Sequence, residues 1–312
     1  MNPQAAFHHI PVLLKETLEA LNLKEGGSYL DGTVGGGGHS EAILQALKGN
    51  CSLVALDRDE EALAAAGARL AAWGNVTLLH GNFHDARDLL DGRLFDGILL
   101  DLGVSSWQLD QAERGFSYHE DAPLDMRMDR SRGLTAAQWL NQTDEKSIMQ
   151  ALYDYADERW AARIAKIILE MRAERPFETT ADLVKAVDRA IPRAVRRKDE
   201  GHPARRAFQA VRIAVNDEIA PLKQALESLA LLLKPGGRLC VITFHSIEDR
   251  AVKQTFARLK NPCVCPVDAP VCTCGKTPLA TLPKGCPAVP SEEELLANPR
   301  ARSARLRCAQ RI

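Results

Sequence analysis

The sequence Tyr29-Leu-Asp-Gly-Thr-Val-Gly-Gly-Gly-Gly-His39 carries an apolar run into a glycine-rich loop, and a second apolar run ends at Leu56-Asp57. Glycines at 35–38 allow a turn with positive φ and a close approach of the backbone to a ligand. A carboxylate at the end of the next strand can accept hydrogen bonds from both hydroxyls of a ribose. The combination predicts a pocket for a cofactor that contains a nucleoside.

The loop does not match the two commonest phosphate-binding patterns. A dinucleotide fingerprint requires Gly-x-Gly-x-x-Gly, but the sixth position is Ser40 when counted from Gly35 and Glu41 when counted from Gly36. A nucleoside triphosphate loop requires Gly-Lys-Ser/Thr, and Gly38-His39-Ser40 stands in its place. A cofactor with ribose and adenine but no phosphate to bind remains, and S-adenosylmethionine fits this description.

Two acids that end strands have different expected roles. Asp57 is expected to bind the ribose hydroxyls, with a helix cap as the alternative because Arg58-Asp59-Glu60 begins a helix. Asp101 closes the fourth expected strand and is expected near the methionine part or the methyl group of the cofactor.

Short apolar runs alternate with amphipathic stretches in the first part of the chain. This is the rhythm of βαβ units, and it predicts an α/β fold with a mostly parallel sheet. Leu233-Lys-Pro-Gly-Gly237 indicates a turn before the strand rhythm returns. We expect strands at 28–31, 52–57, 76–79, 95–101, 238–244 and 304–312.

Helical patterns replace the strand rhythm after Leu109. Caps are expected at Thr143 and Thr180, a stop at Pro192, and a further helix after His202-Pro203. The chain has 312 residues, 46% of them hydrophobic, and this length favours about two domains. The expected domains are a core in two parts, 1–112 and 213–312, and a helical RNA-binding insertion at 113–212, with a Cys- and Pro-rich excursion at 261–290.

Basic residues are clustered although the formal net charge is −1. Residues 185–212 hold nine Lys or Arg against three acids, and residues 300–311 hold five Arg and no acid. Such clusters bind phosphate backbones, but solvated faces balanced by acids elsewhere explain them equally well.

The apolar residues of the segment 1–25 are interrupted by His, Pro, Lys and Glu, which argues against a signal peptide or a membrane span. We expect a cytoplasmic protein without a membrane partner.

Eight cysteines do not indicate a secreted disulfide scaffold, because Cys51 and Cys240 fall inside expected core strands. Cys263-x-Cys265 and Cys272-x-Cys274 provide enough thiolates for a tetrahedral zinc site, but their spacing differs from the usual Cys-x-x-Cys. The alternative is a loop of reduced thiols. These cysteines lie outside the glycine-rich motif, so we assign no metal to the functional site and expect any zinc to be structural.

Eight motifs follow one another along nearly the whole chain. They are His9-Ile-Pro-Val-Leu-Leu14, Asp31-Gly-Thr-Val-Gly-Gly-Gly-Gly-His39, Ile98-Leu-Leu-Asp-Leu-Gly-Val-Ser-Ser106, Glu113-Arg-Gly-Phe-Ser117, Pro123-Leu-Asp-Met-Arg-Met-Asp129, His202-Pro-Ala-Arg-Arg-Ala-Phe-Gln209, Thr243-Phe-His-Ser-Ile-Glu-Asp-Arg250 and Asn298-Pro-Arg-Ala-Arg-Ser303. Together they resemble the motifs of the ribosomal RNA small subunit methyltransferase H family, also called MraW.

The resemblance implies a class I S-adenosylmethionine-dependent methyltransferase with an inserted helical domain. Its substrate would be the exocyclic 4-amino group of a cytidine in the decoding centre of 16S rRNA, within the small ribosomal subunit. For Phe83, stacking on adenine competes with core packing, and for Gln108 a contact with the methionine end competes with a loop-capping role. The implied cofactor contacts are Gly37, Gly38, His39, Asp57, Phe83, Asp101 and Gln108.

Two departures stand out. Members of the family usually have proline where Trp107 stands, and the role of this tryptophan is open. The Asp/Asn-Pro-Pro-Tyr/Phe element of many amino methyltransferases is also missing, because Asp101-Leu-Gly-Val104 occupies its place. This absence and the basic insertion disfavour DNA as the substrate.

The 4-amino group of cytosine is a poor nucleophile, so the site must hold nitrogen, methyl carbon and sulfur in line. The proton can leave after the attack, to a carboxylate, a His or water. We expect Asp101 to align the amine or the sulfonium, and Ser105 or Ser106 to lie near the base. His245 is expected to receive the proton or contact the base, whereas Ser246-Ile-Glu-Asp249 resembles a capping box and is expected to be structural.

Other expectations concern the surroundings of the site. Residues 123–129 form either a lid over the target or a packed surface loop. Phosphate contacts are expected from Arg196, Arg197, Arg205, Arg206 and the arginines of 300–307. The alternative function is a non-catalytic ribosome-assembly factor with a cofactor-sensing pocket. The oligomeric state stays open, a homodimer included.

Overall fold

The structure is a computed structural model that describes residues 11–197, 201–266 and 271–312. His9, which opens one of the family motifs, and residues 198–200 of the basic stretch lie outside the described residues. The chain divides into two compact units, the first formed by Met1–Gly103 and Pro221–Ile312, the second by Val104–Ala220. The second unit contains the expected insertion at 113–212 but begins earlier and ends later.

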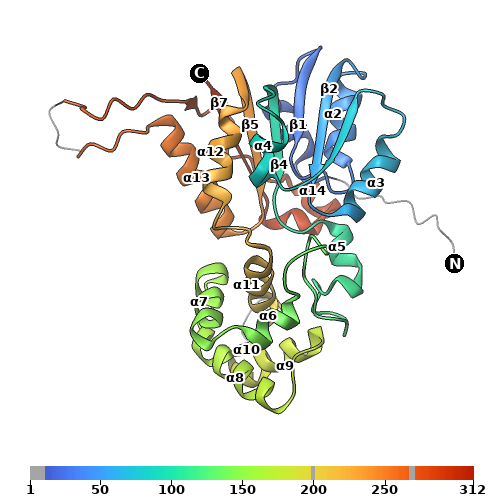
Figure 1. The fold of residues 1–312 in the computed structure, drawn as a ribbon, viewed down its shortest axis with the longest axis vertical. Helices are drawn as coiled ribbons and strands as arrows, with labels where there is room; N and C mark the ends of the chain where they lie inside the picture. The colour runs from blue at the N-terminus through green and yellow to red at the C-terminus, as the bar shows by residue number, and fades with distance from the viewer. Residues whose placement is uncertain (1–10, 198–200, 267–270) are drawn as a thin grey trace. The chain divides into compact units, whose positions relative to one another are not determined.

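The first unit is built on a seven-stranded sheet with the order β3-β2-β1-β4-β5-β7-β6 (Figure 1). Neighbouring strands from β3 to β5 pair in parallel, whereas β7 runs antiparallel to β5 and β6. The six expected strands are confirmed, and β6 is an additional edge strand that the sequence pattern did not predict. The strands are β1 (Gly27–Asp31), β2 (Cys51–Asp57), β3 (Val76–His80), β4 (Phe95–Asp101), β5 (Leu233–Thr243), β6 (Ala280–Thr281) and β7 (Arg305–Arg311).

Apolar runs make the central strands because both faces of the sheet are covered. Ile98, Leu99 and Leu100 are consecutive in β4, and each is 0% exposed. Consecutive side chains of a strand point to opposite faces, so both faces of β4 are buried. This burial explains why the strands appear in the sequence as continuous apolar runs.

The turn expected at 233–237 is wrong, because these residues belong to β5. Leu233 pairs with Phe95 and Arg238 pairs with Gly97, so β5 holds more residues than β4 between the two pairs. Gly236, with φ 79°, takes up this excess in a bulge. The glycine pair therefore bends the strand instead of delaying its start.

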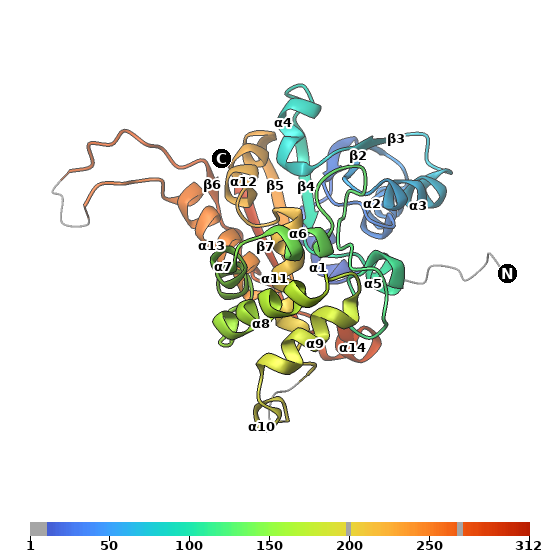
Figure 2. The ribbon, with the colours of Figure 1, turned by 60° about the horizontal axis from the view of Figure 1, so that its bottom comes forward.

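Helices flank the sheet of the first unit (Figure 2). One core cluster joins α1, α2 and α3 to the strands, and it contains Leu21, Ile43 and Ala66 from these helices together with Leu53 of β2. The helices of this unit are α1 (Leu14–Leu21), α2 (Gly38–Ala46), α3 (Glu60–Leu70), α4 (Ala86–Leu89), α12 (Leu222–Leu231), α13 (Ser246–Lys260) and α14 (Glu292–Ala297), with short 3-10 turns η1 (Phe83–Asp85) and η3 (Pro299–Ser303).

The second unit is helical and has its own core. Leu140, Ile148, Ile164, Leu183 and Val211 are buried in one cluster to which five of its helices contribute. Its elements are α5 (Ser106–Asp110), η2 (Ala112–Arg114), α6 (Ala136–Gln142), α7 (Glu145–Ala156), α8 (Ala161–Glu174), α9 (Thr180–Ala190), α10 (Arg193–Arg196) and α11 (Arg205–Asn216).

The predicted caps in this unit are off by one residue. Asp144 rather than Thr143 caps α7, because its Oδ1 accepts a hydrogen bond from Ser147 N at 3.0 Å. Thr179 rather than Thr180 is the N-cap residue of α9. In both places two adjacent residues are common N-caps, so residue type places the start of the helix only to within about one residue.

The segment 123–129 is packed, as the surface-loop alternative expects. Leu124, Met126 and Met128 are 2%, 0% and 3% exposed. The Asn216 side chain donates from Nδ2 to Met126 O at 2.7 Å and accepts at Oδ1 from Met128 N at 2.8 Å. These contacts tie the segment to α11.

Across the described residues, no helix is both long and apolar enough to cross a membrane.

Candidate active site

Three aspartates come together at one edge of the sheet because they end parallel strands. Asp31 closes β1, Asp57 closes β2 and Asp101 closes β4. β1 pairs with β2 on one side and with β4 on the other, so the chain leaves β1 where the strand order reverses. Ligands of open α/β sheets bind at this position.

The glycine-rich loop crosses this edge and is held by the neighbouring strands. Gly32 N donates to Leu99 O at 2.9 Å, and Val34 N donates to Leu56 O at 3.0 Å. Gly37 has φ 81° and directly precedes α2, and a Cβ added there would lie 3.3 Å from Ala66 Cα. A side chain at this position would be strained and crowded, so the loop requires glycine there.

Asp57 is a loop anchor and not a helix cap. Its Oδ2 accepts from Gly35 N at 2.8 Å, and its Oδ1 accepts from Asp59 N at 3.0 Å. The cap of α3 is Asp59, whose Oδ1 accepts from Glu61 N at 3.1 Å. Burial raises the pKa of Asp57, and the two backbone amides oppose that shift. Each carboxylate oxygen keeps a second lone pair for a ligand hydroxyl.

Asp101 has a strongly perturbed carboxyl group. Its pKa is raised from 3.8 to about 8, mainly by burial and in addition by the negative charges of Asp31 and Glu248. Oδ1 is buried without a hydrogen-bond partner among the described residues, and Oδ2 lies 3.7 Å from His39 Nε2. The protonated form is favoured until a positive charge arrives.

Asp31, which the sequence suggested only as a strand end, holds the glycine-rich loop through hydrogen bonds to its side chain. It is 1% exposed, and its Oδ2 accepts from Ser40 Oγ at 2.7 Å while Oδ1 accepts from Thr33 N at 3.2 Å. Burial raises its pKa to about 6 against these two hydrogen bonds. The Thr33 hydroxyl in turn accepts from Asp101 N at 2.6 Å, which links the ends of β1 and β4.

His245 follows β5 and caps α13, in the place that the sequence pattern gave to Ser246. Its Nδ1 accepts from Glu248 N at 3.4 Å, and its Nε2 lies 3.0 Å from Glu248 Oε1. Glu248 Oε2 also accepts from Phe244 N at 2.9 Å. The capping partner is therefore Glu248, whereas Asp249 forms a two-bond ion pair with Arg307. Glu248 was not predicted as a site residue, and only its position three residues after His245 pointed to it.

Phe83 stands at the same edge, directly after β3. Its Cβ lies 3.3 Å from the position that a Cβ on Gly32 would occupy, and its ring meets the His84 ring edge-on at 4.3 Å between centroids. The side chain is half-buried rather than fully enclosed. Burial and the Arg58 charge lower the pKa of His84 to about 4, so its imidazole is neutral.

Ser105 and Gln108 belong to the helical unit, where they form hydrogen bonds with each other. Gln108 N donates to Ser105 Oγ at 3.2 Å, and Ser105 N donates to Gln108 Oε1 at 3.0 Å. This capping box begins α5 and agrees with the structural alternative for Gln108. The catalytic role of Ser105 and the cofactor role of Gln108 stay predictions. The side chain of Ser106 lies outside the described residues.

The basic clusters contain both structural and exposed arginines. Arg212 forms a two-bond ion pair with the buried Glu218 at 2.9 Å, and Arg307 pairs with Asp249, so these two serve the fold. Arg196 pairs with Asp188. The arginines with exposed side chains are Arg193, Arg197, Arg205, Arg206, Arg300, Arg302 and Arg305.

Comparisons with known proteins identify the family of the chain. The sequence profile of the MraW methylase family matches residues 6–312. A protein of Symbiobacterium thermophilum named ribosomal RNA small subunit methyltransferase H is 56% identical over 312 residues, with 98% of each chain covered. The protein of that name from Heliobacterium modesticaldum is 54% identical over 312 residues, covering 98% of this chain and 99% of its own.

Among solved structures, an rRNA methylase from Streptococcus thermophilus is 12% identical, with a TM-score of 0.40 over 98% of this chain and 99% of its own. The match of the family profile over nearly the entire sequence, together with relatives more than half identical, decides the assignment. The chain belongs to the MraW methylase family.

Proposed function

We propose that the protein transfers a methyl group from S-adenosylmethionine to the exocyclic 4-amino group of a cytidine in the decoding centre of 16S rRNA. The observation that carries the proposal is Asp101, a buried carboxyl group beside the glycine-rich loop whose pKa of about 8 makes it responsive to a nearby positive charge. Relatives named for the small ribosomal subunit support its rRNA as the substrate. The family motifs support the cytidine amine.

The residues at the sheet edge match the parts of this cofactor. Asp57 accepts the ribose hydroxyls through the lone pairs that Gly35 N and Asp59 N leave available. Gly37 and Gly38 let the backbone approach the methionine part, with His39 beside Asp101. Phe83 stacks on the adenine ring, because its half-buried ring flanks the end of β1. Gln108 is assigned to the methionine end on the family motif alone.

The catalytic group that this site offers is a carboxyl group whose basicity changes with local charge. S-adenosylmethionine supplies a methyl group on a positively charged sulfur. A positive charge close to Asp101 lowers its pKa, so the carboxylate can accept a hydrogen bond from the cytosine amine and hold it in line. When the charge has moved to the nitrogen, the methylated ammonium group is strongly acidic, and Asp101 can accept the proton that it releases.

His245 and Glu248 support Asp101 from the start of α13, which follows β5. The two residues hold each other through the capping box of α13, and the Glu248 charge raises the pKa of Asp101. In this proposal Glu248 tunes the carboxyl group, and His245 fixes Glu248 and contacts the base from the same edge. Ser105, at the start of α5, is assigned a place near the target base.

Labelled methyl transfer tests the proposal directly. Small subunits that lack the modification are incubated with radioactive S-adenosylmethionine and the protein, and the modified nucleoside is identified by mass spectrometry. Asp101→Asn is expected to lose transfer while S-adenosylmethionine still binds. Label on a nucleoside other than 4-methylated cytidine would refute the substrate. Tight small-subunit binding with no transfer would favour the non-catalytic assembly factor.

A further inference from the structure

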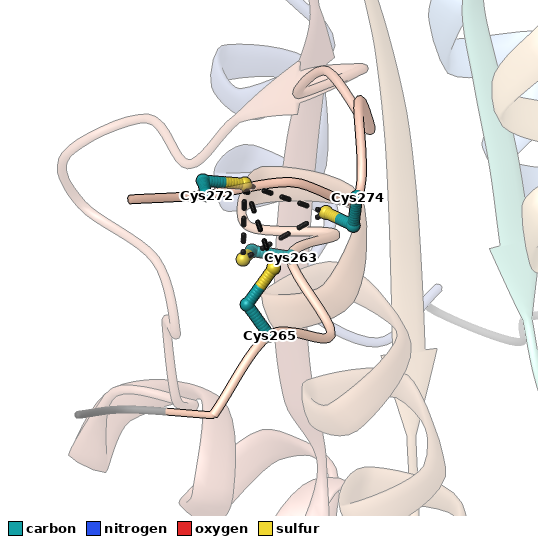
Figure 3. A group of neighbouring side chains, drawn as sticks. All are labelled: Cys263, Cys265, Cys272 and Cys274. Atoms are coloured by element: carbon teal, nitrogen blue, oxygen red, sulfur yellow. Dashed lines mark hydrogen bonds between the residues drawn. The ribbon is translucent and has the colours of Figure 1, made fainter. Parts of the chain in front are cut away.

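Two short segments between α13 and β6 bring four cysteines together, outside the sheet edge described above. Residues 261–266 lead away from α13 and residues 271–279 return to β6, and both Figure 1 and Figure 2 show these arms side by side. Each arm contributes one Cys-x-Cys pair, Cys263 with Cys265 and Cys272 with Cys274 (Figure 3). The four side chains point toward a common centre.

The separations of the sulfur atoms are those of a tetrahedral thiolate site. A zinc–sulfur bond of about 2.3 Å places neighbouring sulfurs of a tetrahedron about 3.8 Å apart. Cys272 Sγ lies 3.6 Å from Cys263 Sγ, 3.8 Å from Cys265 Sγ and 3.5 Å from Cys274 Sγ. Cys274 Sγ lies 3.8 Å from Cys263 Sγ, and all four atoms are within 4.8 Å of one another.

Disulfides and core packing do not account for this cluster. All four cysteines are free, and a disulfide would require about 2.05 Å between two sulfurs. Cysteines that serve as small hydrophobic residues are buried, but Cys263 and Cys272 are exposed and the other two are half-buried. Val264 and Val271 beside them are 65% and 71% exposed, so the arms have little apolar packing of their own.

Backbone amides face two of the four sulfurs. The amides of Thr273 and Cys274 are near Cys265 Sγ, and those of Val264 and Lys276 are near Cys274 Sγ. Gly275, with φ 65°, makes the turn that directs the Lys276 amide back to the sulfur. Outer hydrogen bonds of this kind orient metal ligands and stabilise their negative charge.

We propose that Cys263, Cys265, Cys272 and Cys274 bind one zinc ion that joins the two arms. Four thiolates complete the tetrahedron and leave no open position for water or substrate, so the ion is structural. Each pair comes from a different arm, and the ion therefore closes a loop that hydrophobic contacts do not close. Its function is to fix the arm that leads into β6.

Metal analysis of the full-length, untagged protein tests the site. Protein purified without chelators is expected to contain about one zinc ion per chain by mass spectrometry of the metal. Reconstitution with cobalt should give the thiolate-to-cobalt charge-transfer bands of a tetrahedral sulfur site. Cys272→Ser should lose the zinc and these bands. The matched control Cys51→Ser, at the half-buried start of β2, should keep both.

Hydrogen exchange adds a readout that does not depend on activity. A chelator that removes the zinc should accelerate amide exchange at 261–266 and 271–281 and leave β4 unchanged. The proposal is overturned if the wild-type protein holds no zinc and all four thiols react freely, if it holds iron in place of zinc, or if Cys272→Ser retains as much zinc as wild type. The zinc and iron contents are measured on the wild-type protein, so these two results test the proposal even if Cys272→Ser fails to fold.

Discussion

Replacement of Asp101 by asparagine should make the cofactor-free protein more stable, relative to wild type, as the pH rises. In the unfolded chain the carboxyl group ionises near its ordinary value of 3.8, whereas in the folded protein its pKa is raised to about 8. Between these two values the folded state binds a proton that the unfolded state has lost. Wild type therefore loses stability with increasing pH in this window, while asparagine, which does not titrate, removes the loss.

The size of the effect follows from the same pKa shift. Each pH unit inside the window costs about 1.4 kcal/mol, so the interval from pH 5 to pH 8 corresponds to about 4 kcal/mol for a fully desolvated group. The Asp101 side chain keeps 26% of its surface exposed, and contact with water reduces the shift. We therefore expect the stability difference between Asp101→Asn and wild type to grow by about 2 kcal/mol over this interval.

Urea unfolding monitored by circular dichroism at pH 5, 6, 7 and 8 measures this difference. Asp96→Asn is the matched control, because Asp96 lies in the same strand but bonds Lys234 Nζ at 2.7 Å and Ser28 N at 2.9 Å. Although burial alone would raise the pKa of Asp96, these hydrogen bonds hold it below 3.8. The stability that Asp96 contributes is lost only as pH falls through its lowered pKa, so the difference for Asp96→Asn should stay constant from pH 5 to pH 8.

A flat difference for Asp101→Asn over the same interval would refute the reasoning, because it would mean that Asp101 is already ionised at pH 5. Cofactor binding gives a second check on the same group. Calorimetry at pH 7 in two buffers of different ionisation enthalpy should detect proton release when wild type binds S-adenosylmethionine. The Asp101→Asn protein should release fewer protons.

Three further predictions concern cofactor and RNA binding. Asp57→Ala should weaken binding of S-adenosylmethionine about 10- to 100-fold by calorimetry, because a charged hydrogen-bond acceptor is lost, and an unchanged Kd would exclude Asp57 from the ribose site. Gly37→Ala should cost about 1–2 kcal/mol in urea unfolding through its positive φ, and equal stability would show that the loop can rearrange. Arg205→Ala with Arg206→Ala should make the dependence of log Kd for rRNA on log salt shallower by about 2, measured by filter binding, whereas Lys223→Ala, also exposed, should leave it unchanged.

Strands were predictable because their signal is local. β2 and β4 each place a short apolar run before an acid, and burial of both faces of the sheet makes such runs continuous. β6 has two residues and no pattern of its own, so it exists only through pairing with β7. The bulge in β5 likewise depends on its register with β4, which a local reading of Leu233 to Gly237 does not contain.

The site was predictable in its composition but not in its electrostatics. Sequence motifs pointed to Asp57 and Asp101, because an acid at the end of a strand is a recognisable position. They did not reveal that Asp31 and Glu248, distant from each other in the chain, both raise the pKa of Asp101. The cysteines show the same limit, since two Cys-x-Cys pairs permit a zinc site but only the return of the chain to β6 brings the sulfurs together.

The charge at the sheet edge also explains why the glycine-rich loop departs from phosphate-binding patterns. Asp31, Asp57 and Asp101 end three adjacent strands, and burial together with the charge of a neighbouring aspartate raises the pKa of Asp31 to about 6 and that of Asp101 to about 8. A pyrophosphate would add negative charge to carboxyl groups that resist ionisation, whereas a sulfonium would relieve them. The cofactor is therefore selected by the sign of its charge as well as by the shape of the loop.

A neutral analogue that lacks the positive sulfur should lose affinity relative to S-adenosylmethionine as the pH rises through the pKa of Asp101. Calorimetric titration of both ligands from pH 6 to pH 9 would show whether their Kd values diverge.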